Sequence, residues 1–211
     1  MKRFLSIVVV SIGFMMCLFA CTTENNDNTF NPTDTLEIPD AVDFSDATEQ
    51  QLAIYFDLAK EALETYYMAA IAQKPFPSFT ISTTEYCQKY IQMKFKYESR
   101  FAKEAVALSF ELKKWKIVDD SLWCNISMLI EFRYRRADFT SSISGPIQLI
   151  IENPKKPAIA DWYDGDSTGF DAQARWDGLD LSLEENSLYR LSSHNIDDIL
   201  NEGQKVLDSI R

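Results

Sequence analysis

The chain has 211 residues, of which 46% are hydrophobic, and its formal net charge at pH 7 is −11. This acidic balance makes nucleic acid a poor partner, because binding to nucleic acid depends on neutralising phosphates with Lys and Arg. Residues 41–211 are enough for one domain with a real core and too few for two.

The first 20 residues have the pattern of a secretory signal peptide. Lys2 and Arg3 precede an apolar run over 4–19, and the small Ala20 closes it. A charged start, an apolar stretch and a small-residue processing site are typical of such a leader. The apolar run is short for a membrane-spanning helix, which needs about 20 apolar residues. We therefore expect residues 1–20 to be removed; the alternative is an uncleaved N-terminal anchor, and both place the chain outside the cytoplasm.

The segment Leu18-Phe19-Ala20-Cys21 resembles the lipobox of bacterial lipoproteins. The resemblance implies cleavage before Cys21, which then carries a diacylglyceryl thioether and an N-acyl chain. Each buried CH₂ contributes about 0.8 kcal/mol, so several acyl chains would hold the protein to a membrane. Thr22 stands where Asp would be the familiar inner-membrane retention signal, which favours the outer membrane of a Gram-negative bacterium. The expected partner is therefore a membrane, bound through the N-terminal lipid.

Residues 21–40 are predicted to be a flexible tether. The segment is rich in Thr, Asn, Asp and Glu and contains Pro32 and Pro39. Such a composition cannot bury enough apolar surface to offset its ordering entropy. A single domain over 41–211 follows the tether.

Two helices are predicted at the start of this domain. Asp46 with Glu49, and later Ser82 with Glu85, have the spacing of a capping box before an apolar stripe of helical period. Pro75 ends the first helix.

The hydrophobic period then changes from 3.6 to 2, which is typical of strands. Val106, Leu108, Phe110 and Leu112 are the predicted inward series of the first strand, and a change of parity before Trp115 predicts a bulge or turn near Lys113-Lys114. Further strands are predicted over 126–134, 147–151 and 158–164, and short connections imply antiparallel neighbours. A C-terminal amphipathic helix follows from Ile196 to Ile210, with Gly203 as its weak point.

This order of elements resembles the NTF2-like fold over roughly 46–163. The aromatic-rich helix faces and the stretch Lys114 to Asp119 are similar to segments common in that family. The resemblance implies an α+β fold in which N-terminal helices pack on a curved antiparallel sheet and leave an apolar pocket. Residues 165–211 depart from the pattern by continuing into another helix. The alternative is an unrelated α+β domain with the same element order.

No catalytic residue and no cofactor is predicted. His194 is the only histidine, so the sequence has too few histidines to favour a histidine-based metal site or a Ser-His or Cys-His triad. Asp161 and Tyr163 are the residue types that pocket enzymes of NTF2-like fold use for proton transfer. Because adjacent strand residues point to opposite faces, the two share a pocket only if Trp162 points outward.

The ligand-binding candidates are Trp115, Trp162, Tyr163 and Asp161. Indole rings stack on sugars, which suggests a glycan ligand, whereas core filling is the alternative interpretation of the tryptophans.

Asp164, Asp166 and Thr168 match the start of a calcium loop, but Arg175 stands where position twelve requires a bidentate acid. A polar Asp-Gly turn is the favoured interpretation, so no metal site is predicted.

Cys87 and Cys124 remain in the mature chain. An oxidising compartment favours a disulfide between them. Their apolar neighbours in the sequence favour two free, buried thiols instead. Both alternatives stay open.

We expect a lipid-anchored, non-catalytic domain that binds a small molecule, a glycan or an envelope protein. The alternatives are an interaction subunit of a cell-envelope complex and a small pocket enzyme of NTF2-like type. An apolar cavity favours ligand binding, and a large exposed apolar patch favours the interaction subunit.

Overall fold

The computed structural model describes residues 43–100, 103–134, 139–165, 169–175 and 190–210, which belong to one unit spanning Ile38–Arg211. The predicted signal peptide, Cys21 and the tether lie outside these residues. The elements in chain order are η1 (Phe44–Asp46), α1 (Glu49–Ile71), β1 (Ser82–Thr83), α2 (Glu85–Glu98), β2 (Lys103–Val118), β3 (Ser121–Tyr134), β4 (Thr140–Glu152), β5 (Ala158–Asp164), α3 (Phe170–Ala174) and α4 (Ile196–Ser209).

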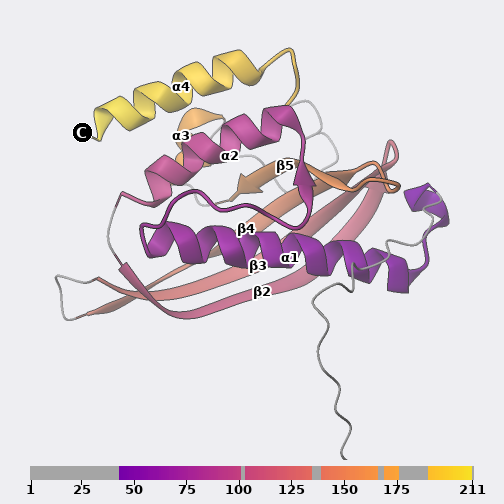
Figure 1. Cartoon of the computed structure of the whole chain (residues 1–211), viewed down its shortest axis with the longest axis horizontal. Helices are drawn as coiled ribbons and strands as arrows, with labels where there is room; N and C mark the ends of the chain where they lie inside the picture. Colours follow the sequence, from indigo (N-terminus) through magenta and orange to yellow (C-terminus); the bar gives the residue numbers. More distant parts are fainter. Residues whose placement is uncertain (1–42, 101–102, 135–138, 166–168, 176–189, 211) are drawn as a thin grey trace, which may run out of the picture. The chain divides into compact units, whose positions relative to one another are not determined.

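The predicted fold class is confirmed. The fold is α+β, with α1 and α2 packed on a bent, mostly antiparallel sheet and α4 at the C-terminal end (Figure 1). This arrangement is consistent with an NTF2-like α+β fold. None of the described helices is long and apolar enough to cross a membrane.

The sheet has the strand order β1-β5-β4-β3-β2. Strands β2 to β5 pair antiparallel, as their short connections predict. The very short β1 pairs parallel with β5, through Ser82 opposite Ala158 and Thr83 opposite Ile159. This pairing was not predicted, because two residues are too few to show an alternation.

Both helices begin two residues later than the capping boxes predicted. Thr48 caps α1, accepting a hydrogen bond from the Gln51 backbone N–H while the Gln51 side chain accepts one from Thr48 N–H. Thr84 caps α2. The predicted caps Asp46 and Ser82 were wrong because these residues belong to η1 and β1, and an extended threonine follows each by two positions.

The predicted bulge in β2 is confirmed, since the register with β3 shifts between Leu112 and Lys114. A second shift lies between Ala105 and Ala107 and was not predicted. It leaves Val106 53% exposed, so the assignment of Val106 to the inward series was wrong. The physical reason is that each bulge switches the alternation of the strand.

Aromatic side chains fill the core between the helices and the sheet. Trp162 of β5 is fully buried, and its ring centroid lies 4.8 Å from that of Tyr66 on α1. Tyr66 in turn makes edge contacts with Tyr67 and with Phe95 of α2. These contacts join both helices to β5.

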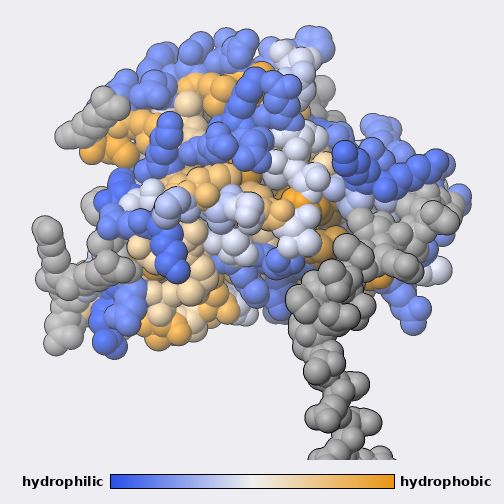
Figure 2. Space-filling view, in the orientation of Figure 1, coloured by the Kyte–Doolittle hydropathy of each residue, from blue (hydrophilic) through white to orange (hydrophobic). Residues whose placement is uncertain are grey.

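The helix α4 lies against α2 and α3 at Gly203. A Cβ atom at this position would lie 2.6 Å from the sulfur of Met93 and 2.8 Å from the Cζ atom of Phe170. The opposite face of α4 is hydrophilic (Figure 2). Gly203 is therefore a point of close packing as well as a position of weak helix propensity.

We expect Gly203→Ala to lower the free energy of unfolding by about 1–2 kcal/mol, because the added methyl group overpacks the contact with the buried Phe170 ring. Helix propensity alone predicts the opposite, a gain of about 1 kcal/mol. Urea denaturation distinguishes the two. The control is Asn201→Ala on the exposed side of α4, which should leave stability unchanged or slightly raised. A stabilised Gly203→Ala variant would contradict close packing here.

Candidate functional site

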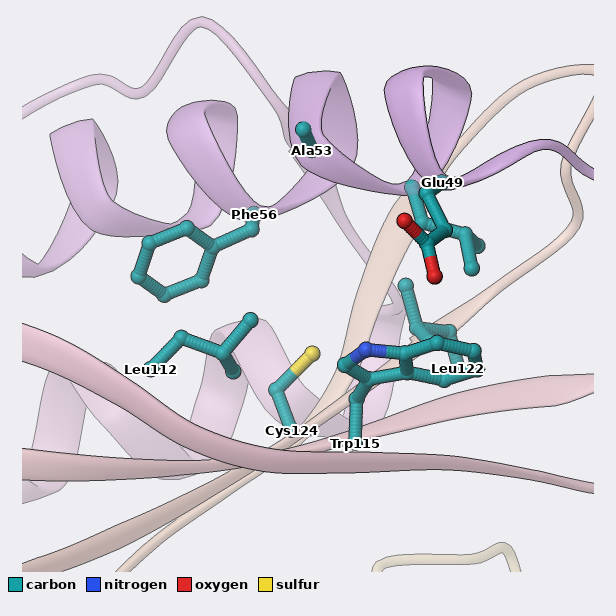
Figure 3. Close-up of a pocket in the computed structure, with 8 residues that line it drawn as sticks. Glu49, Ala53, Phe56, Leu112, Trp115, Leu122 and Cys124 are labelled. Atoms are coloured by element: carbon teal, nitrogen blue, oxygen red, sulfur yellow. The ribbon is translucent and has the colours of Figure 1, made fainter.

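A cleft opens between the start of α1 and the strands β2 and β3. Its volume is about 240 Å³. The residues that line it are Glu49, Leu52, Ala53, Phe56, Leu112, Trp115, Leu122 and Cys124 (Figure 3).

Helix and strand periodicity bring these side chains together. The four residues on α1 have the spacing i, i+3, i+4 and i+7, which places them on one helix face. Across the cleft, Leu112 and Trp115 are three residues apart, and a regular strand would point them to opposite faces. The bulge between Leu112 and Lys114 keeps both on the helix side of the sheet. Trp115 lies opposite Cys124 in the β2–β3 pairing.

The floor of the cleft is apolar and its mouth is polar. Leu52 and Leu122 are buried, whereas Glu49 is exposed and Trp115 is 45% exposed. Figure 3 shows the Glu49 carboxylate directed towards the indole of Trp115 from the other side of the opening. A ligand in the cleft would therefore meet one carboxylate and one indole ring at the entrance.

Both cysteines of the described chain are free thiols. The Cys124 sulfur points towards the cleft (Figure 3), and burial raises the pKa of Cys124 to about 12. Burial also raises the pKa of Cys87 on α2. The Cys124 thiol is thus neutral near pH 7 and contributes an apolar surface to the cleft.

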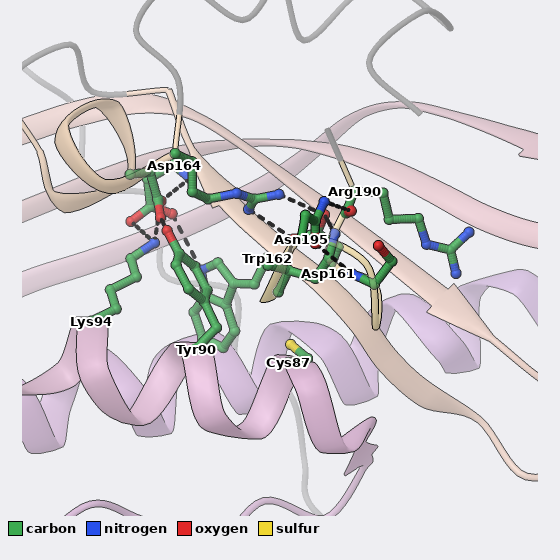
Figure 4. Close-up of polar contacts among 12 residues, drawn as sticks. Cys87, Tyr90, Lys94, Asp161, Trp162, Asp164, Arg190 and Asn195 are labelled. Atoms are coloured by element: carbon green, nitrogen blue, oxygen red, sulfur yellow. Dashed lines mark hydrogen bonds and ion pairs between the residues drawn. The ribbon is translucent and has the colours of Figure 1, made fainter. Parts of the chain in front are cut away.

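A group of charged side chains is buried where α2, β5 and α3 meet. Lys94, only 1% exposed, lies between two carboxylates, with its Nζ atom 2.7 Å from Asp164 Oδ2 and 2.6 Å from Asp171 Oδ2 (Figure 4). Tyr67 and Tyr90 donate hydrogen bonds to Asp164 and Asp171, respectively. We call Lys94, Asp164 and Asp171 the buried ionic cluster.

The electrostatics of this cluster reflect burial and pairing together. Burial alone would lower the pKa of the Lys94 ammonium, but Asp164 and Asp171 outweigh burial and raise it. Burial and the neighbouring Asp171 raise the pKa of the Asp164 carboxyl. The backbone N–H of Asp164 also donates to Asp171, at 2.6 Å. The ammonium stays charged in the interior because two carboxylates hold it.

Asp161 is paired separately with Arg175. The guanidinium donates two hydrogen bonds of 2.9 Å to the two carboxylate oxygens. The backbone N–H groups of Trp162 and Leu191 donate to the same carboxylate. The Asp161 carboxylate therefore has its acceptor sites occupied and is not placed to act on a ligand.

The four predicted ligand-binding residues lie in three different environments. Trp115 borders the cleft. Trp162 points into the aromatic core, and its indole N–H donates to Asp164. Asp161 and Tyr163 are brought together by Arg175, whose guanidinium carbon lies 5.2 Å from the centroid of the Tyr163 ring. The structure thus separates Trp115 from the three candidates on β5.

Of the calcium-loop candidates, Asp164 is engaged by Lys94, while Asp166 and Thr168 lie outside the described residues. Arg175, at the twelfth position of that loop, binds Asp161. Among the described residues no group of three or more potential metal-ligating side chains is found.

The sequence contains a signal for the burial of Lys94 that the prediction did not use. Lys94 occupies an inward position of α2, at helical spacing from the buried Cys87, Tyr90, Ile91 and Tyr97. A lysine on an apolar stripe requires a buried anionic partner. Asp164 and Asp171 gave no such signal, because the Gly- and Asp-rich stretch around them has the composition of a turn.

Comparison with protein-family models, with curated proteins and with solved structures found no match for this chain. The function is therefore inferred from the residues of the cleft.

Lys94→Met should destabilise the domain by about 3–5 kcal/mol, because it leaves two buried carboxylates without their cation. The matched control is Lys89→Met on the exposed side of α2, where only a pair with Glu85 is lost and a change below about 0.5 kcal/mol is expected. Urea denaturation measures both. Adding Asp164→Asn and Asp171→Asn to Lys94→Met should recover part of the loss; equal effects of the two lysine variants would contradict a structural role for the cluster.

Proposed function

We propose that this chain is a lipid-anchored envelope protein whose folded domain binds a small apolar ligand, or the apolar part of a larger one, in the cleft between α1, β2 and β3. The cleft itself carries the proposal. A dry cavity of about 150 Å³ in a protein core holds benzene, so a cleft of about 240 Å³ has room for a bicyclic ring or a medium alkyl chain.

The polar groups around the cleft support binding rather than catalysis. A proton-transfer site needs a carboxylate and a hydrogen-bond donor that converge on the ligand inside an apolar pocket. Glu49 is exposed at the mouth, and the Cys124 thiol is neutral. The carboxylates of β5 are paired with Arg175 and Lys94.

The anchoring part of the proposal is supported by the sequence. The lipobox-like segment that ends at Cys21 follows a charged start and an apolar run. Acyl chains on Cys21 would hold the domain at the outer membrane of a Gram-negative bacterium. The tether over 21–40 would let the domain extend away from the membrane surface.

An interaction subunit of an envelope complex is the alternative. The large apolar side chains that are exposed in the described chain are spread over α1, β2, β3 and the residues next to β4 and α4, namely Met68, Val106, Trp115, Leu129, Phe139 and Ile210. Isolated exposed apolar side chains are ordinary on folded domains. Trp115 is the one among them that borders the cleft, and this favours ligand binding.

Neutral n-alkanols from butanol to decanol test the cleft. Isothermal titration calorimetry should show the dissociation constant falling about fourfold per added CH₂, equivalent to about 0.8 kcal/mol, until the cleft is full. Ala53→Leu should weaken binding at least about tenfold, because the larger side chain fills the cleft.

The matched control is Gln50→Leu, which adds an apolar side chain on an exposed neighbouring position outside the cleft. It should bind like the wild type. No alkanol binding by the wild type, or full binding by Ala53→Leu, would contradict the proposed site and favour the alternative function, an interaction subunit.

The anchor is tested on the full chain expressed in a Gram-negative host. Intact-mass measurement should find a chain that begins at Cys21 and carries acyl mass, and Cys21→Ser should accumulate as unprocessed precursor. Ser11→Ala, inside the apolar run, is the control and should be processed normally. A mature chain without acyl mass would refute lipid anchoring.

A further inference from the structure

We propose that the cleft selects cationic amphiphiles, binding the ammonium group of an alkyl or aryl amine between the Glu49 carboxylate and the Trp115 indole while the apolar part of the ligand lies on the floor. This inference rests on the proposed function and names the ligand class of the same site. Four features of the mouth support it.

The first feature is the carboxylate of Glu49. Glu49 is the first residue of α1, and its side chain is exposed to solvent. Among the described residues, eight ion pairs have a defined geometry, and none of these eight includes Glu49. Its charge is therefore present at the mouth of the cleft and available to a ligand.

The second feature is the pair of capping hydrogen bonds at the first turn of α1, which occupies two of the backbone N–H groups that an anion could bind. The Thr48 hydroxyl already accepts from the Gln51 backbone N–H, and the Gln51 side chain accepts from Thr48 N–H. With Glu49 beside these satisfied groups, a ligand carboxylate would meet a negative charge. The Glu49 carboxylate therefore makes this end of the cleft less favourable for a ligand carboxylate than for an ammonium group.

The third feature is the exposed indole of Trp115. The face of a tryptophan ring carries partial negative charge and is the best aromatic surface for a cation. The neighbours Lys114 and Lys116 flank Trp115 in the strand, so their side chains leave from the opposite face of the sheet. Lys116 indeed lies over Trp123, with Nζ 5.1 Å from the ring centroid. The positive charges next in sequence are thus turned away from the cleft.

The fourth feature is the acidic end of the domain around the mouth. Asp43 and Asp46 lie at η1, directly before α1. Asp120, in the turn between β2 and β3, accepts a hydrogen bond of 3.1 Å from the Phe44 backbone N–H. These carboxylates lie at the same end of α1 as Glu49, and each of them disfavours an anionic ligand there relative to a cationic one.

The test compares ligands of equal chain length that differ only in the head group. Hexylamine, hexan-1-ol and hexanoate are titrated into the domain at pH 7, where hexylamine is protonated. We expect hexylamine to bind about tenfold more tightly than hexan-1-ol, a gain typical of one cation–π contact and one exposed carboxylate. Hexanoate should bind more weakly than hexan-1-ol.

Two variants assign the preference to the proposed groups. Glu49→Gln keeps the shape of the side chain and removes its charge, so the amine-to-alcohol ratio should fall to within about twofold while alcohol affinity is retained. Trp115→Leu should lower the same ratio. The matched control is Glu64→Gln, about four turns further along α1, which should keep the wild-type ratio.

The outcomes separate this inference from the function on which it rests. Equal binding of amine and alcohol by the wild type, or a tenfold preference retained in Glu49→Gln, would overturn amine selection and leave the apolar cleft intact. Failure of hexan-1-ol to bind at all would instead refute the proposed function.

Discussion

The interaction on which the rest of the structure depends is the contact of Lys94 with two aspartates in the interior. Taking charges out of water costs several kcal/mol per ion, and only a well-formed set of partners offsets that cost. The partners come from β5 and α3, while Tyr67 of α1 and Tyr90 of α2 complete the hydrogen bonding. Two helices, the last strand and the segment after it must therefore meet in one arrangement. The helix α4 then lies on α2 and α3 at Gly203.

This constraint also explains where the cleft can form. The C-terminal half of α1 is held by the contact of Tyr67 with Asp164 and by the aromatic core around Tyr66. The helix has 23 residues and a length of about 34 Å, so its first turns extend well beyond that region. There Phe56 and Leu52 face the sheet over a cleft rather than a filled interior. The packed C-terminal half of α1 therefore fixes the position of its first turns, which border the cleft.

Features that depend on residues near one another in the sequence were predicted from local periodicity. They are the two long helices, the C-terminal helix, the strands over 126–134, 147–151 and 158–164, and the bulge after Leu112. The parallel pairing of β1, the exposure of Val106 and the ion pairs of Asp161 and Asp164 depend on distant partners and left no periodic trace. Of the candidate site residues, Trp115 borders the cleft, and its role there stays a prediction. The role proposed for Glu49 was not predicted, because a glutamate at the start of a helix was interpreted only as a capping residue.

The strand β2 has a further consequence as the outer strand of the sheet that the described residues form. An outer strand presents unpaired backbone groups on which a second molecule can build. Two irregularities interrupt β2, and Glu111, Lys113 and Lys114 are exposed along it. On the proposed membrane surface, copies of the protein would be confined to two dimensions and would collide edge to edge far more often than in free solution. Bulges and exposed charges on an outer strand disfavour cross-β association, so the irregularity that keeps Trp115 on the helix side of the sheet would also oppose edge-to-edge pairing of such copies.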